Sequence, residues 1–158
     1  MIKIIAIGSV KEAGARQLVD EYLKRFNKAY HPLIIELPEA RRSKNLSDAQ
    51  IKQAIDDESK RILDKLFEQD VVILCDVEGT LLSSTQLSDM LIEHFNYQPA
   101  PIVFVIGGPD GVNETLKKRA NTRLSFSKMT FPHQLLRIML IEQLYRSYTI
   151  AQKIPYHK

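Results

Sequence analysis

Two segments in the second half of the chain have the residue types expected of a ligand pocket. The first, VIGGPDG at residues 105–111, follows an apolar run, and open α/β sheets bind ligands at the carboxyl ends of their strands. Gly107 and Gly108 would let a ligand approach the backbone closely, and Asp110-Gly111 predicts a turn. The segment matches neither the GxGxxG fingerprint nor a phosphate-binding loop ending in Gly-Lys-Ser/Thr. A ligand-binding loop and a simple strand-to-helix turn both remain open.

The second segment, LSFSKMTFPH at residues 124–133, mixes apolar rings with hydroxyls and one lysine just before an expected helix. Pro132 suits a first helical turn, where the missing N–H costs nothing. Free backbone amides at that helix start, beside apolar rings, would hold a flat and partly polar ligand. The alternative, that Phe126, Met129 and Phe131 are core residues, fits equally well.

Other candidates for chemistry are weaker. The chain finishes on Tyr156, His157 and Lys158, and on residue type alone such an end is more often a frayed terminus than a site. The four histidines share no metal-ligand spacing and there is one cysteine, so we expect no metal. Cys75 lies in an apolar, strand-like run, which favours a small buried side chain over a nucleophile.

Strand-like and helix-like segments alternate along the chain and would position these residues. Apolar, β-branched runs predict strands, and apolar residues at helical spacing predict helices. The expected strands are 2–7, 33–37, 71–77, 101–106 and 123–127, and the expected helices are 11–29 and 48–67, the latter with Ser47 as N-cap, then 84–95, 113–120 and 132–151. Nearly continuous apolar strands are typical of a parallel sheet covered on both faces. We therefore expect one α/β domain over residues 1–158, with a mostly parallel sheet and helices on both faces.

Composition places the chain among globular proteins. Hydrophobic residues make up 44% and charged residues 26% of 158, and no apolar run is long enough to cross a bilayer. The N-terminus reads as a strand rather than a signal peptide, and a single cysteine suits a reducing compartment. The expected location is therefore the cytoplasm, away from membranes.

Two features predict partners. Residues 117–158 carry nine Lys/Arg against one acid, whereas residues 1–116 have an excess of acids. Clustered cations bind polyanions by counterion release, which favours nucleic acid over a merely solvated basic face. The expected helix 132–151 is apolar nearly all round, so it is buried either in its own domain or partly by a second chain, and we expect a dimer interface.

Taken together, the chain resembles the SPOUT methyltransferases and, within them, the RlmH (YbeA-type) family. The similarity runs the length of the chain, through AIG at 6–8, VIGGPDG at 105–111, LSFSKMTFPHQLLRIMLIEQLYRSY at 124–148 and YHK at 156–158. That family methylates N3 of a pseudouridine in 23S rRNA. The resemblance therefore implies this activity on the large subunit or whole ribosome, with S-adenosyl-L-methionine as methyl donor, a C-terminal trefoil knot (the α/β-knot fold) and a homodimer.

The resemblance also assigns residues. Cofactor contacts fall on Cys75, Gly107 and the run Phe126, Ser127, Lys128, Met129, Thr130 and Phe131. The family commonly has leucine at the place of Cys75, so that contact is apolar or made by the backbone. Catalytic and RNA-positioning roles fall on the Tyr156, His157 and Lys158 ending.

The implied reaction needs little from the protein beyond orientation and a proton acceptor, because a sulfonium is already a good leaving group. His157 has a suitable ordinary pKa for taking the N3 proton, while water and the terminal carboxylate are alternatives. Tyr156 would stack on or hydrogen-bond the base, and Lys158 or Arg137 would neutralise developing charge.

RNA contacts and rival functions complete the sequence-based expectations. Lys117, Lys118, Arg119, Arg123 and the basic loop at 41–44 are expected to contact phosphates. A non-catalytic ribosome-binding or assembly factor would use the same basic surface. A nucleotide-dependent oxidoreductase is a further rival, which the missing glycine fingerprint argues against.

Overall fold

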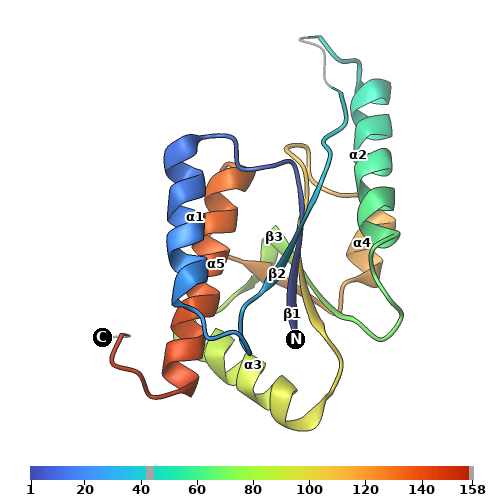
Figure 1. The fold of residues 1–158 in the computed structure, drawn as a ribbon. Helices are drawn as coiled ribbons and strands as arrows, with labels where there is room; N and C mark the ends of the chain where they lie inside the picture. The colour runs from blue at the N-terminus through green and yellow to red at the C-terminus, as the bar shows by residue number, and fades with distance from the viewer. Residues whose placement is uncertain (42–44, 157–158) are drawn as a thin grey trace.

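The computed structural model describes residues 1–41 and 45–156, in which strands and helices alternate (Figure 1). Tail residues His157 and Lys158, and 42–44 of the expected phosphate-binding loop, lie outside the described residues. The elements are β1 (Ile2–Ile7), α1 (Ala13–Arg25), β2 (Leu33–Leu37), α2 (Asp48–Leu63), β3 (Val71–Leu81), α3 (Ser84–Tyr97), β4 (Ile102–Ile106), α4 (Glu114–Arg119), β5 (Thr122–Ser125) and α5 (His133–Ala151).

The sheet has the strand order β2-β1-β4-β3-β5, and every neighbouring pair is parallel. The expected mostly parallel sheet is therefore confirmed. The expected strand 71–77 is too short, because the chain leaves the β3–β5 ladder after Cys75 and rejoins it at Thr80, so that β3 extends to Leu81. Gly79 permits this detour, since a Cβ there would lie 2.6 Å from the Arg123 backbone.

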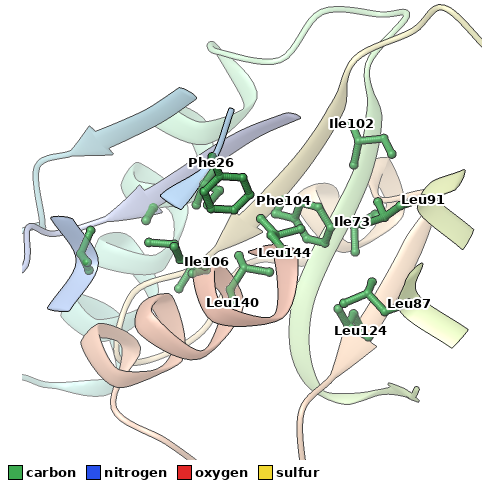
Figure 2. Close-up of a cluster of buried hydrophobic side chains, with 14 of the residues drawn as sticks. Phe26, Ile73, Leu87, Leu91, Ile102, Phe104, Ile106, Leu124, Leu140 and Leu144 are labelled. Carbon is green, nitrogen blue, oxygen red and sulfur yellow. The ribbon is translucent and has the colours of Figure 1, made fainter. Parts of the chain in front are cut away.

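Helices cover both faces of the sheet because alternate strand residues point to opposite sides. On one face, β4 residues Phe104 and Ile106 pack with α1, α3 and α5 (Figure 2). On the other face, Val103 and Val105 of the same strand pack with α2 and α4. Figure 1 shows α1 and α5 on the side of the sheet opposite α2 and α4. The prediction of helices on both faces is confirmed.

The helix ends follow local side-chain chemistry. Ser47 caps α2 and Ser83 caps α3, and each forms a capping box with a glutamine three residues later. The Ser47 cap confirms the sequence-based prediction. The expected end of α2 at residue 67 is wrong, because the chain after Leu63 continues as tighter turns with i→i+3 hydrogen bonds.

The final helix α5 is buried mainly by its own chain. Leu140, Ile141 and Leu144 are at most 1% exposed, and α1 and α3 both pack against the helix. Leu135, near the start of the helix, is 44% exposed and remains uncovered by the rest of the described chain. Of the described helices, none is long and apolar enough to span a membrane.

Truncating a core leucine of α5 tests this packing. We expect Leu140→Ala to lower the free energy of unfolding by about 2–5 kcal/mol, because it leaves a cavity between α5 and the sheet. Leu33→Ala, on the edge strand β2 where the side chain is 52% exposed, is the control and should change stability by less than about 1 kcal/mol. Urea unfolding at neutral pH measures both. Equal losses in the two variants would mean that the helix is not buried as described.

Candidate functional site

A cavity of about 760 Å³ opens where β3 and β4 end, and we call it the β3–β4 cavity. The two strands are parallel neighbours in which Cys75 pairs with Ile106, so the residues that follow them meet at one edge of the sheet. The walls are formed by residues 75–78, 106–112, 126–127 and 129–133, with contributions from Lys117, Leu124 and Leu136. Both sequence segments singled out as pocket candidates therefore face the same cavity.

The first wall is the glycine loop, residues 107–112. Gly111 has a φ of +86°, and its N–H donates to the Gly108 carbonyl at 3.0 Å, which confirms the expected turn. A Cβ on Gly107 would lie 2.6 Å from Val112 Cγ1, and one on Gly108 would lie 2.1 Å from Glu58 Oε2. Both positions therefore have room for glycine alone, and this close packing leaves the loop backbone facing the cavity.

The second wall is the aromatic segment, residues 126–132. Ser127 Oγ accepts the Met129 N–H at 3.0 Å, and Ser125 Oγ lies 2.9 Å from the Ser127 carbonyl, so local hydroxyls shape the turn. Phe126 packs partly against the core, whereas Met129 is 73% exposed at the cavity. The segment is therefore a cavity wall rather than core alone. Pro132 is the N-cap of α5, one residue before the helical turn in which we expected it.

Carboxylates that the sequence-based reasoning missed lie beside these apolar walls. Asp76 and Glu78 line the cavity directly after Cys75. Asp76 Oδ2 is buried without a hydrogen bond from any described residue, with Arg123 Nε at 3.5 Å as an ion-pair partner. Their position at the carboxyl end of an expected strand was the signal that could have found them. The cavity thus offers apolar rings, a glycine backbone and negative charge, which suits a flat ligand carrying a cationic group.

Cys75 is a wall of the cavity and not a nucleophile. Burial, and then the charge of Asp76, raise the pKa of its thiol from 9.0 to about 12. The thiol is therefore neutral at physiological pH, and a neutral thiol is a poor nucleophile. This agrees with the sequence-based interpretation of a small, apolar side chain.

Seven of the eight residues assigned to a cofactor by resemblance line the β3–β4 cavity. They are Cys75, Gly107, Phe126, Ser127, Met129, Thr130 and Phe131. The eighth, Lys128, is exposed and lies outside the set of described residues that line the cavity. Of the four residues assigned to catalysis, the two that the structure describes, Arg137 and Tyr156, lie outside this lining.

Arg137 is buried at the start of α5, 1% exposed. Its guanidinium donates to the carbonyls of Gly8 at 2.8 Å and Ile7 at 3.3 Å, and it forms an ion pair with Glu36 at the end of β2. Burial lowers the pKa of Arg137, and the Glu36 carboxylate opposes that shift. The side chain therefore ties α5 to the ends of β1 and β2, and it lies outside the described lining of the β3–β4 cavity.

Tyr156 lies against α5 of its own chain. Its hydroxyl donates to Glu142 at 3.2 Å, and the Arg146 guanidinium lies 4.9 Å from its ring centroid. Burial and a hydrogen bond with Tyr22 raise the pKa of Tyr156 to about 12, so the phenol stays protonated at neutral pH. Glu142 and Tyr22 line a different cavity of about 470 Å³ between α1, α3 and α5.

Tyr156 lies outside the described lining of the β3–β4 cavity, although its side chain turns back along α5. His133, at the start of this 19-residue helix, lines the cavity, whereas Tyr156 follows its other end. The hydroxyl of Tyr156 nevertheless contacts Glu142, which lies six residues, or about 9 Å of helix axis at 1.5 Å per residue, beyond the wall residue Leu136. The structure thus does not bring Tyr156 and this cavity together within one chain.

The expected phosphate-binding cations are largely engaged within the chain. Arg119 donates to the carbonyls of Phe67 at 2.7 Å and Asp70 at 3.0 Å. Lys117 lies 3.0 Å from Glu114, whose hydrogen bond raises its pKa. Arg123 lies at 3.5–3.6 Å from two carboxylates at the cavity. Lys118 is exposed and remains the best placed of the four for contact with a phosphate.

Removing the Arg137 guanidinium tests its structural role. We expect Arg137→Met to lower the free energy of unfolding by about 2–4 kcal/mol, since two buried carbonyls lose their charged donor. Arg25→Met, at the exposed end of α1, is the control and should cost less than about 1 kcal/mol. The measurement is urea unfolding at pH 7. An Arg137→Met variant as stable as the parent would show that the tie contributes nothing to the fold.

Comparison with known protein families gives a match over nearly the whole chain. Residues 1–157 match a family model described as "Predicted SPOUT methyltransferase". The matched region includes the glycine loop, the aromatic segment and Tyr156. The match therefore covers nearly the whole sequence and does not rest on one motif.

Proposed function

The chain belongs to the SPOUT methyltransferase family, and from that membership we propose that it methylates N3 of a pseudouridine in 23S rRNA. Membership itself implies a methyltransferase that uses S-adenosyl-L-methionine and has an α/β knot. The nucleoside, the RNA and a cytoplasmic site of action are our proposal. They are supported by the RlmH-type motifs and by the basic C-terminal third of the chain.

The β3–β4 cavity is the proposed cofactor site, and one observation carries the assignment. Seven residues that the family resemblance assigns to S-adenosyl-L-methionine come from three separate segments and line this one cavity. The chemistry of the walls fits the cofactor as well. Apolar rings suit an adenine, the glycine backbone offers hydrogen-bonding groups, and Asp76 and Glu78 suit cationic groups. When bound, the cofactor supplies the methyl group from its sulfonium.

The protein's own contribution would be orientation and proton transfer. Holding two reactants in line lowers a barrier by about 7–11 kcal/mol in well-aligned systems. Tyr156 is a proton donor rather than a base, because its raised pKa of about 12 keeps the phenol neutral. The proton acceptor would therefore be His157, the terminal carboxylate or water, with Tyr156 stacking on or hydrogen-bonding the base.

A homodimer would bring a tail and a cavity together. Within one chain the described tail residue, Tyr156, packs on Glu142 of α5 and lies outside the described lining of the β3–β4 cavity. We infer that the tail of one copy completes the cavity of the other. Two leucines support such an interface, since Leu18 of α1 and Leu135 of α5 are each 44% exposed on neighbouring helices.

A non-catalytic ribosome-binding or assembly factor is the second candidate, favoured by the charge imbalance alone. Residues 117–158 carry nine Lys/Arg and one acid. Phosphate binding by such a surface needs no cofactor. Lys117, Arg119 and Arg123 have partners within their own chain, so fewer cations are free to bind phosphate than the count of nine indicates.

The central prediction is transfer of labelled methyl from S-adenosyl-L-methionine to ribosomal RNA. We expect transfer to assembled large subunits or ribosomes and little to free 23S rRNA, because this small chain would rely on ribosomal structure for recognition. Nuclease digestion and mass spectrometry then identify the modified base. Ribosomes already methylated at the site serve as the control. Absence of transfer to both substrates, with cofactor binding intact, would favour the assembly factor.

Deleting residues 156–158 tests the tail. We expect kcat to fall at least about 100-fold, as for loss of an acid–base group, while the Kd for S-adenosyl-L-methionine stays within about threefold. The Kd is measured by calorimetry and kcat by label transfer. Normal turnover by the truncated chain would exclude a catalytic role for the tail.

Mixing variants extends this test to the dimer. A tail-deleted chain combined with Gly107→Val, which closes the cavity against Val112, should regain activity that neither variant has alone. Activity would then come from mixed dimers in which one intact tail meets one intact cavity. The same mixture made from two tail-deleted chains is the control and should stay inactive. No recovery in the verified mixed dimer would contradict completion of the site between chains.

A further inference from the structure

Helix α2 presses a buried carboxylate against the glycine loop. Glu58 is 1% exposed, although an ionisable side chain is rarely so deeply buried. Its Oε1 accepts the Ala40 N–H at 2.8 Å, just beyond β2. Its Oε2 occupies the space beside Gly108, where a Cβ would lie only 2.1 Å away. Glu58 thus connects the chain after β2 to a residue of the cavity wall.

The same helix holds the other end of the loop. The Asn113 N–H donates to Ser59 Oγ, and Asn113 Nδ2 donates to Asp56 Oδ1, both at 2.9 Å. Asn113 is in turn the N-cap of α4, where its side chain accepts the Leu116 N–H at 3.0 Å. Asp56, Glu58 and Ser59, which lie within about one turn of α2, therefore reach Gly108 near one end of the loop and Asn113 just beyond the other.

The glycine loop needs such external support. Three of its six residues, at 107, 108 and 111, are glycines, which lose more backbone freedom on ordering than other residues. Inside the loop, the Gly111 N–H donates to the Gly108 carbonyl and closes a turn, but that bond does not fix the turn relative to the sheet. The buried contacts to α2 fix the loop relative to the sheet, because α2 itself packs on the sheet through Ile62.

We propose that α2 sets the position of the glycine loop for cofactor binding, with Glu58 and Ser59 as positioning residues. The proposal rests on the proposed function, since it takes the β3–β4 cavity as the cofactor site. Neither side chain is among the described residues that line the cavity, so both act through the loop backbone. Their effect falls on cofactor affinity rather than on the chemical step.

A double-mutant cycle between Glu58 and Gly108 tests the contact. Gly108→Ala should raise the Kd for S-adenosyl-L-methionine and S-adenosylhomocysteine about tenfold, because the new Cβ displaces the carboxylate and shifts the loop. Glu58→Ala should raise it by a similar factor. In the double variant the methyl fits the vacated space, so the combined loss should stay near tenfold to twentyfold rather than about 100-fold.

The control is Gly14→Ala in α1, where an added Cβ has no described atom within 4 Å. Its Kd should match the parent. For Glu58→Ala, kcat at saturating cofactor should stay within about twofold, because Glu58 does not line the cavity and its loss weakens binding of the ground state and the transition state equally. A fall in Tm with unchanged Kd, or additive losses in the double variant, would overturn the proposal.

Hydrogen exchange makes the test independent of the proposed function. In the unliganded protein, Glu58→Ala and Ser59→Ala should speed amide exchange at residues 107–113 at least about tenfold, without a matching change in the strands. Gln53→Ala, on the same helix with an exposed side chain, should leave the loop unchanged. Exchange in the loop that is unaffected by both variants would refute positioning by α2. A parent protein that binds no cofactor would instead refute the proposed function.

Discussion

The site depends on a constraint of parallel sheets, namely that neighbouring strands of the same direction end at the same edge. In this chain β3 lies between β4 and β5, and Cys75 pairs with Ile106 on one side and with Leu124 on the other. The residues that follow these three strands must therefore converge. Because β4 is buried along its whole length, at most 1% exposed, a shift in its register would carry an apolar side chain at one of its ends out of the core. The cavity is thus a consequence of the same burial that stabilises the sheet.

The convergence of the strand ends brings the loops together, and buried polar contacts then fix the shapes of these loops. Arg137 joins the start of α5 to the ends of β1 and β2, and Glu39, just beyond β2, lies 3.2 Å from His133. Glu58 and Ser59 perform the same task for the glycine loop. Each of these groups is costly to bury without a partner, so each specifies one arrangement of the loop that it meets. The polar atoms beneath the cavity walls therefore determine the shape of the pocket, while the wall residues determine what it binds.

Local patterns in the sequence predicted the helices and strands. Features that depend on contacts between distant segments were not predicted. The strand Leu33–Leu37 and the cap at Ser47 follow from neighbouring residues and were correctly placed. The extension of β3 past Cys75 depends on β5, and the engagement of Arg119 depends on carbonyls near residue 67. Resemblance singled out residues that periodicity left open as core, such as Phe126 and Phe131, and the structure places both at the β3–β4 cavity. The resemblance did not indicate Glu58, which touches the pocket only through the backbone of Gly108.

The helix α5 is held in place at its start and near its end. A helix of 19 residues cannot bring its two ends together, and α5 is held by Arg137 at its start and by aromatic contacts of Tyr145 and Tyr148 near its end. Tyr156, which follows this helix, folds back only as far as Glu142 and lies outside the described lining of the β3–β4 cavity. If the tail and the cavity act on one substrate, as we propose, a second copy would supply one of them. The packing of Tyr156 on α5 would then make the dimer a requirement of catalysis, because a single chain could bind the methyl donor and still lack the groups that position the base.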